Sequence, residues 1–415
     1  MFKKKFPLIL LSSFFLFSSA IAANASSAAS AATPASATST EEANPVVKLL
    51  QSIEYSSRFK VEYSDNIFST PDNQDSDWRE IFTQTLLFKL PGERQYFQLG
   101  YSGNYGFYNE ESTGVLGHSA NLLYSYRPFD GFSIGLRDDY NWLQDSKITT
   151  TLGDRVLALG YIQNVPSVEM KYEINPDTMV AVSTYYQFLD VVDSNNDDFI
   201  DNKRVGAKTQ LNYNFTPLRN LAGFVGYDYR QVSYNQTPEK AFSGMRPFVG
   251  LSEKVIGIMK LSEEVGFDNI DMVEQGNADD HNVDFKFLAE SIFSIYTKLK
   301  LSFDYNVKNS SFRRQYTQYA SDVAALNLTH AINPKTYILF DYSYEHQRFN
   351  ADDILIGQTR EDNDAFVQNL RLALSRKLNS WLNLDWRYDY TKRDTDFAQE
   401  GYTNNQFSAA LTAKY

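Results

Sequence analysis

The 415-residue chain contains no cysteine. This absence excludes a disulfide framework, a thiolate metal site and a lipid-modified N-terminal cysteine. After the first 25 residues no segment approaches 18 consecutive apolar residues, which excludes a protein that crosses a membrane with helices. An excess of positive charge is also lacking, since 51 acidic residues outnumber 39 basic ones and the formal net charge is -12, and we expect no nucleic acid among the partners.

The N-terminus carries a targeting pattern. A basic stretch, MFKKKF, is followed by the apolar PLILLSSFFLF and then by small residues with cleavage sites after Ala22 or Ala25. This order is typical of a secretory signal peptide, which we assign to residues 1–25. A membrane anchor is the weaker alternative, because about 11 apolar residues are too few to cross a bilayer as a helix. Residues 26–50, rich in Ala, Ser and Thr, are expected to form a flexible periplasmic lead-in.

Aromatic residues are abundant in the chain. It holds 28 Tyr, 30 Phe and 4 Trp, yet its mean hydropathy is only -0.41. A transmembrane β-barrel reconciles these facts, because its strands alternate apolar residues toward lipid with polar residues toward water. We therefore expect residues 51–415 to form one outer-membrane barrel.

Period-two alternation is the dominant pattern, and it is clearest in four segments, 204–215, 298–308, 381–390 and 407–415. Leu299, Leu301 and Phe303, for example, alternate with lysines and an aspartate. Such alternation predicts strands with one apolar and one polar face. The final Tyr415 resembles the recognition signal of bacterial outer-membrane barrels.

Connections between these segments are of two kinds. Short turns recur about every 40 residues, near 91, 129, 176, 218, 256, 295, 334 and 379. Long polar segments separate them and are expected to be extracellular loops, at 75–80, 190–204, 265–282, 308–319, 349–364 and 392–405. With a first strand near 52–68 and a last near 402–415, eight turns predict an all-β, antiparallel up-and-down barrel of 18 strands with short periplasmic turns. Sixteen is the alternative, because 78–90 and 155–174, which contains Pro166, give weak patterns.

One turn is written twice, as INPDT from Ile174 and INPKT from Ile332. Proline fixes φ, asparagine can satisfy nearby backbone groups, and threonine opens the next strand. The two copies lie about four hairpins apart. We therefore expect periplasmic turns here and not a functional motif.

The period-two alternation places charged residues of both signs on the face expected to line the bore. Rows of opposite charge across a wet lumen would orient polar solutes, although inward residues of a barrel are polar in any case. Inward Tyr96, Tyr108 and Tyr185 are candidate sugar contacts, whereas most other aromatics phase toward lipid and fit interfacial girdles. The candidate lumen-lining charges are Arg58, Lys60, Arg127, Arg137, Lys208, Arg230, Lys298, Lys300, Asp304, Asp341, Arg371, Asp385, Arg387 and Asp389.

Calcium is the one cofactor that the sequence offers. Asp193, Asn195 and Asp197 occupy the first, third and fifth positions of a calcium loop, and Asp201 occupies the ninth. The required glycine is replaced by an aspartate and the bidentate glutamate by an arginine, so a solvated acidic loop is the alternative.

Histidines give no sign of catalysis. His118 phases toward lipid, but no serine accompanies it on that face, as an outer-membrane lipid hydrolase would need. We expect no enzyme and no catalytic residues.

The first hairpin carries a family signal. Its FKVEYSDNIFSTPDN, followed by a tyrosine-rich strand, resembles over residues 55–110 a β-barrel porin family of Gram-negative outer membranes. The resemblance implies a pore for hydrophilic solutes, with several relatives associated with exopolysaccharide export. Partners would be outer-membrane lipid and lipopolysaccharide, a hydrophilic solute or polysaccharide, and periplasmic export proteins. Asp65 and Asn66 would form a turn by bonding to their own backbone. The alternative is a plugged structural or surface-interaction barrel, and the oligomeric state is left open.

Overall fold

The computed structural model describes residues 52–66, 76–109, 114–145, 160–191, 202–216, 221–234, 241–255, 258–272, 280–309, 318–349, 363–395 and 401–415. The assigned signal peptide and lead-in, and the candidate calcium loop at 193–201, lie outside these ranges. Within them, no helix is long and apolar enough to cross a membrane.

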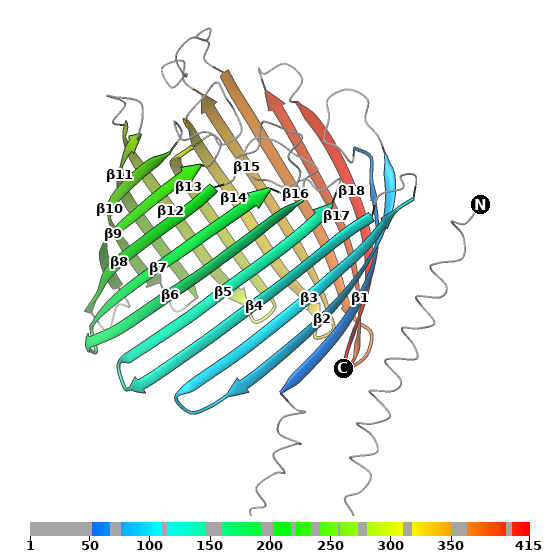
Figure 1. Cartoon of the computed structure of the whole chain (residues 1–415), viewed down its shortest axis with the longest axis horizontal. Coiled ribbons are helices and arrows are strands. Elements are labelled where there is room, and N and C mark those ends of the chain that lie inside the picture. Colours follow the sequence, from blue (N-terminus) through cyan, green and yellow to red (C-terminus); the bar gives the residue numbers. More distant parts are fainter. Residues whose placement is uncertain are drawn as a thin grey trace, which may run out of the picture. The chain divides into compact units, whose positions relative to one another are not determined.

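Every element of the described chain is a β-strand (Figure 1). Their bounds are β1 (Ile53–Ser64), β2 (Asp77–Pro91), β3 (Gln95–Tyr108), β4 (Gly114–Phe129), β5 (Phe132–Asp145), β6 (Tyr161–Asn175), β7 (Thr178–Val191), β8 (Asn202–Thr216), β9 (Leu221–Tyr234), β10 (Phe242–Val255), β11 (Met259–Met272), β12 (Asp280–Ser294), β13 (Thr297–Asn309), β14 (Gln318–Asn333), β15 (Thr336–Phe349), β16 (Asn363–Lys377), β17 (Leu382–Thr395) and β18 (Tyr402–Lys414).

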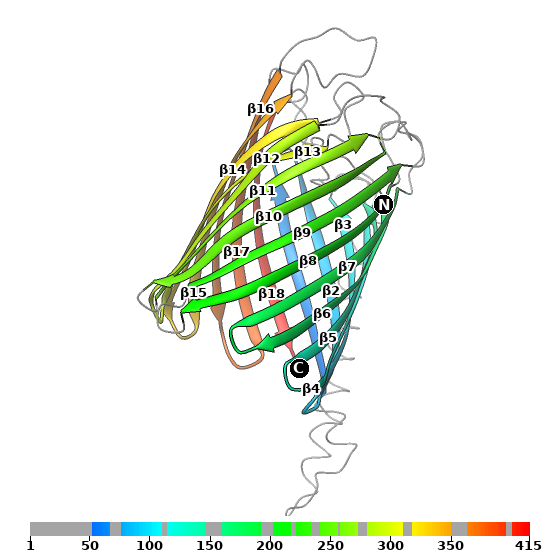
Figure 2. The same ribbon diagram turned by 90° about the vertical axis from the view of Figure 1, so that its left-hand side faces the viewer.

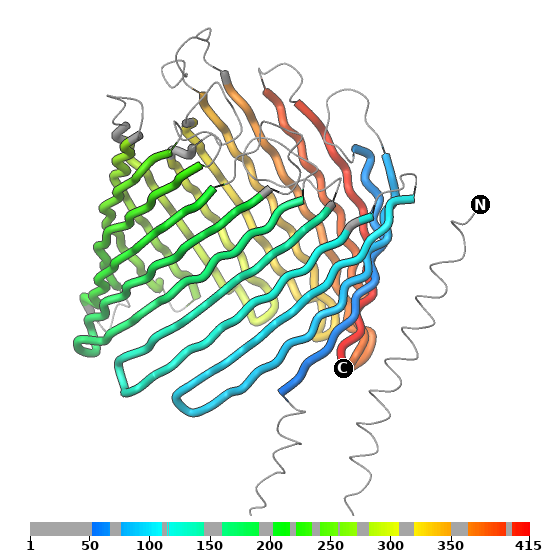
Figure 3. Tube along the Cα trace, in the orientation of Figure 1, coloured from blue at the N-terminus to red at the C-terminus, as the bar shows by residue number. Residues whose placement is uncertain are grey.

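The eighteen strands close into a barrel. Each pairs antiparallel with its neighbours in the chain, and β1 also pairs with β18, from Ser56↔Lys414 to Ser64↔Gln406. The strands run obliquely round the wall, as two views at right angles show (Figures 1 and 2). The Cα trace shows neighbouring strands side by side along the wall (Figure 3). Closure leaves no open edge, so the wall can satisfy its own backbone polar groups. The predicted fold and the count of 18 strands, not 16, are confirmed.

Both weakly patterned segments form strands. The segment predicted at 78–90 lies in β2, and the part of 155–174 that the structure describes forms most of β6. Proline has no N–H to give to a ladder, and the register of β6 with β7 accordingly skips from Asn164↔Phe188 to Ser167↔Tyr185. Pro166 still pairs with Asp138 of β5. The proline therefore interrupts one ladder without ending the strand.

Several predicted loops are wrong at their edges. The segment 75–80 was expected to be a loop, but Asp77–Glu80 begins β2. Within the expected loop 265–282, β11 continues to Met272 and β12 begins at Asp280. Within 392–405, β17 continues to Thr395 and β18 begins at Tyr402. The hydrogen-bonded ladder continues there, for example at Tyr63↔Trp78. The polar composition of these segments predicts loops, although the pairing of the strands continues through them.

The repeated INPxT segments are turns, as predicted. The Asn175 Oδ1 accepts the N–H of Asp177 at 3.0 Å, and the Asn333 Oδ1 accepts the N–H of Lys335 at 2.9 Å. These bonds are the local backbone contacts expected of asparagine in a turn. The turn between β4 and β5 instead uses Gly131 at a φ of 83°, which L side chains rarely adopt.

The pairing of β1 with β18, here called the seam, is extended by side chains. The Asp65 carboxylate accepts the backbone N–H of Asn405 at 2.7 Å and its side-chain amide at 2.6 Å. The Asn66 amide donates to the Thr403 carbonyl at 2.9 Å. We expected both residues to bond to the backbone of their own turn, and that stays a prediction because residues 67–75 lie outside the described ranges; the contacts with β18 were not expected.

Candidate functional site: the inner wall

The two faces of the wall differ in exposure and chemistry. Val249, Phe267 and Val283 on one face are widely exposed, whereas Arg246 and Asp284 on the opposite face are buried. Side chains on the convex, outer surface of a closed sheet spread apart and are the more exposed ones, so the buried, charged face is the inner wall. An apolar exterior around a polar interior is the arrangement of a transmembrane barrel.

All fourteen candidate charges lie in strands, and all but Arg127, which lies at a register shift after Tyr126, share the inner face by register. They are Arg58 and Lys60 in β1, Arg127 in β4, Arg137 in β5, Lys208 in β8, Arg230 in β9, Lys298, Lys300 and Asp304 in β13, Asp341 in β15, Arg371 in β16, and Asp385, Arg387 and Asp389 in β17. Their contact with a solute stays a prediction.

One group of these charges joins β15 to β17. The Arg371 Nε lies 2.8 Å from the Asp389 Oδ1, and its Nη1 lies 3.8 Å from the Asp341 Oδ2. Arg387 forms a second ion pair with Asp389. Arg58 of β1 lies 4.0 Å from Asp385, which extends the row across β18.

A second group lies on β9 to β12 and is more buried. Arg230 pairs with Asp268, while Arg246 pairs with Asp284 and, at 2.5 Å, with Glu264. The sequence interpretation missed Asp268 because it read 265–282 as an outer loop. Beside this group, the Lys208 Nζ lies 4.6 Å from the centre of the Phe248 ring.

A third group connects β1, β2 and β3. Glu62 is almost completely buried and accepts from Lys60 at 2.6 Å and from Arg79. Arg79 also donates to the Tyr108 hydroxyl at 3.3 Å. Arg79 was missed because 75–80 was read as a loop, and its contact holds Tyr108, a candidate sugar contact, buried in the wall.

The other candidate sugar contacts are half-buried. The Tyr96 hydroxyl donates to the Gln98 Oε1 at 2.8 Å. The Tyr185 ring leans over Gly206, where a Cβ would lie only 2.1 Å from the ring. Glycine is required at this close approach, and Tyr185 therefore lies against the wall. Contact of either ring with a sugar stays a prediction.

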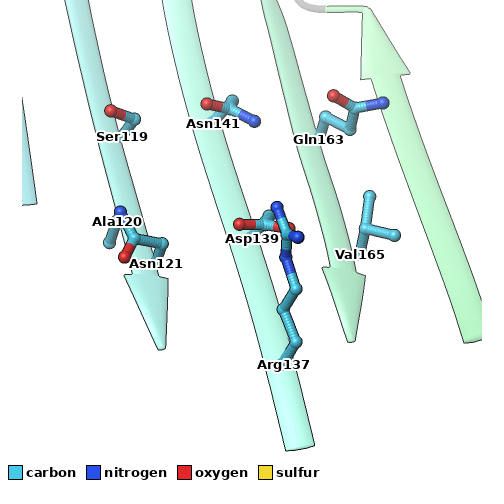
Figure 4. Close-up of a pocket in the computed structure, with 8 residues that line it drawn as sticks. All are labelled: Ser119, Ala120, Asn121, Arg137, Asp139, Asn141, Gln163 and Val165. Atoms are coloured by element: carbon cyan, nitrogen blue, oxygen red, sulfur yellow. The ribbon is translucent and has the colours of Figure 1, made fainter. Parts of the chain in front are cut away.

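A recess of about 410 Å³ opens on β4, β5 and β6 (Figure 4). Within it, Arg137 extends along β5 and its Nε lies 2.5 Å from the Asp139 Oδ2. The remaining lining is largely amide and hydroxyl, from Ser119, Asn121, Asn141 and Gln163, with Ala120 and Val165. Amides both donate and accept hydrogen bonds, so this wall suits a solute rich in hydroxyl or carboxylate oxygens.

His118 lies on the outer face among aromatic rings. Its Nδ1 lies 2.6 Å from the Tyr101 hydroxyl, and its ring stacks on Trp142 with centroids 5.1 Å apart. Within the described ranges, no group of three or more His, Asp or Glu side chains gathers to hold a metal. The arrangement of the described residues is one of hydrogen bonds and ion pairs along a wall.

No family model matches the chain, and no curated protein matches it in sequence. Among solved structures, it is similar to OpdK of Pseudomonas aeruginosa, with 10% identity, 88% of this chain and 99% of that chain covered, and a TM-score of 0.49. OccAB4 of Acinetobacter baumannii is 11% identical, with 88% of this chain and 98% of that chain covered and a TM-score of 0.47. The siderophore receptor PirA of P. aeruginosa is 9% identical, with 88% of this chain and 80% of that chain covered and a TM-score of 0.47. Likeness at this level leaves function to be argued from the inner wall itself.

Proposed function

We propose that this chain is an outer-membrane channel for hydrophilic solutes. The observation that carries the proposal is the contrast between the two faces of a closed wall, apolar outside and charged inside. Barrels of 16–18 strands are wide enough to leave an aqueous channel. Every element of the described chain belongs to the wall, so none of them fills the bore.

The inner wall can replace the water around a polar solute. Ion pairs on β15–β17 and amides on β4–β6 offer donors and acceptors at successive positions. A polar solute exchanges hydrogen bonds with water for hydrogen bonds with the wall, whereas an apolar solute gains none. Selection for hydrophilic solutes follows from this difference.

Reconstitution in planar lipid bilayers tests the channel. The purified barrel should give stepwise conductance, and heat-unfolded protein in the same detergent should give none. A barrel that stays closed at every voltage rejects the channel and favours the alternative, a plugged structural or surface-interaction barrel.

A finer proposal is that the channel is the exit pore of an exopolysaccharide secretion system, working with periplasmic partners. It rests on the resemblance of residues 55–110. Deleting the gene and measuring cell-surface polysaccharide tests it, because unchanged export rejects this role while leaving a general channel in place.

Localisation and calcium are proposals of the same kind. An outer membrane of a Gram-negative bacterium, with its lipid and lipopolysaccharide, fits the exposed aromatics of the outer face, such as Tyr101, Tyr213 and Phe303. Calcium at Asp193, Asn195, Asp197 and Asp201 would rigidify one loop. A thermal transition that responds to neither calcium nor EDTA rejects the calcium site.

A further inference from the structure

We infer that the bore selects anions, and that its solutes carry carboxylate, phosphate or sulfate groups. The inference rests on the proposed channel function and names the charge class of its solutes. Its basis is the order of charges within the ion pairs of the inner wall. In these pairs the cation faces the bore and the carboxylate lies behind it.

Side-chain exposure shows this order in widely separated strands. In β5, Arg137 is 64% exposed and its partner Asp139 30%. Across β11 and β12, Lys286 is 44% exposed and Glu264 15%. In β17, Arg387 is 43% exposed and Asp389 18%. Arg230 and Asp268 show the same order.

The order has a simple cause in side-chain length. An aspartate or glutamate carries its charge close to the backbone, whereas lysine and arginine carry theirs at the end of a long stem. The carboxylates are consequently held by wall groups, as when the Ser375 hydroxyl donates to Asp385 at 2.5 Å. The longer cations extend past them toward the axis of the bore.

Unpaired lysines strengthen the cationic layer. Lys208, Lys254, Lys260 and Lys298 lie on the inner face, and among the described residues none of them has a carboxylate within 4.0 Å of its Nζ. Asp228 and Asp304 also lie on this face. Each of the two, however, stands directly across the ladder from a longer lysine, Lys208 or Lys286.

Some pairs do not follow the order, and their positions limit the layer. In Lys89–Glu54 and Lys171–Glu169 the carboxylate is the more exposed partner, and both pairs lie near the ends of strands joined by short turns. Arg246 is buried between Glu264 and Asp284 and adds to the wall only. At this mouth, where Lys254, Lys260 and Lys298 also lie, the order of charges therefore does not hold for every pair.

Electrostatic focusing converts this layer into selectivity. A water-filled passage with low-dielectric walls concentrates the field of the charges that line it, and raises the local concentration of their counter-ions. The formal net charge of the whole chain, -12, would by itself suggest cation preference. The layered wall predicts the opposite.

The zero-current potential across a KCl gradient in planar bilayers tests the inference. Chloride should be preferred over potassium, by less than the about ten-fold at the lower end of electrostatic focusing, because the bore is wide and holds both signs. The preference should fall as salt is raised, because screening shortens the reach of the wall charges. Conductance with cation preference, or with none, overturns the inference and leaves the channel intact. Absence of conductance overturns the channel itself.

Variants assign the effect to the layer. The triple variant Arg137→Gln, Lys286→Gln and Arg387→Gln should lose most of the chloride preference, and Asp139→Asn with Asp389→Asn should increase it. Lys392→Gln removes an ion-paired cation from the outer face of β17 and should leave selectivity unchanged. Each variant should first be shown to fold, by the same difference in gel mobility between unheated and heated samples that the parent barrel gives. A folded triple variant with the parent's selectivity overturns the inference.

Discussion

Replacing Asp65 by alanine should open the seam between β1 and β18. The carboxylate of Asp65 accepts two hydrogen bonds from Asn405, one from its backbone N–H at 2.7 Å and one from its side-chain amide at 2.6 Å. Hydrogen bonds to charged groups contribute about 1.5–3 kcal/mol each, and the half-buried position of Asp65 favours the lower end. Because the two bonds share one residue, we expect Asp65→Ala to lower the free energy of unfolding by about 2–3 kcal/mol.

Urea titration of the folded barrel in detergent micelles, followed by tryptophan fluorescence, measures this loss. Asp65→Asn keeps one acceptor and should lose about half as much. Asp394→Ala is the control, because Asp394 is widely exposed and pairs only with an exposed lysine on the outer face. Asn405→Ala removes the amide donor but keeps the backbone N–H, so Asp65→Ala added to it should cost only the remaining bond, about half of its cost in the parent. An Asp65→Ala barrel as stable as its parent would refute this account of the seam.

Four further predictions concern single positions. Glu62→Gln leaves Lys60 and Arg79 without their buried partner and should cost about 3 kcal/mol in the same titration, whereas Glu54→Gln, at an exposed pair, should leave the midpoint unchanged. Gly131→Val forces a branched side chain to a φ of 83° and should cost about 1–2 kcal/mol; Gly131→Asn should cost clearly less, and equal losses would contradict the reason given. Gly206→Ala should push the Tyr185 ring into the bore and lower single-channel conductance, and Tyr185→Ala added to it should restore the current. Asn333→Ala removes the acceptor of the Lys335 N–H and should lower stability by about 0.5–1.5 kcal/mol, whereas Asn333→Asp should retain the bond and the stability.

Alternation predicts this fold well because lipid and water impose it on each strand separately. The segment 298–308, taken from its apolar and polar residues alone, corresponds to β13 at Thr297–Asn309. Turn residues supply the spacing, and the spacing supplies the number of strands. Neither signal needs knowledge of which strand lies next to which.

Partners across the ladder are a different matter, because they depend on the register between strands. Arg79 and Asp268 lie in segments that their polar composition assigns to loops, although Arg79 meets Glu62 and Asp268 meets Arg230. Asp65 shows the same limit. Its neighbours in the chain suggest a turn, and its actual partner lies 340 residues away.

The seam has a consequence for the order of folding. Its contacts join Ser64 to Asn404 and Asp65 to Asn405, each pair 340 residues apart, whereas the other ladders join strands that follow one another in the chain. Contacts between distant residues carry the largest loop-closure cost and form late. Hairpins can therefore assemble in succession, but closure waits for the final strand. A chain deprived of β18 would keep two unpaired edges, a state prone to aggregation, so β18 decides whether the wall closes.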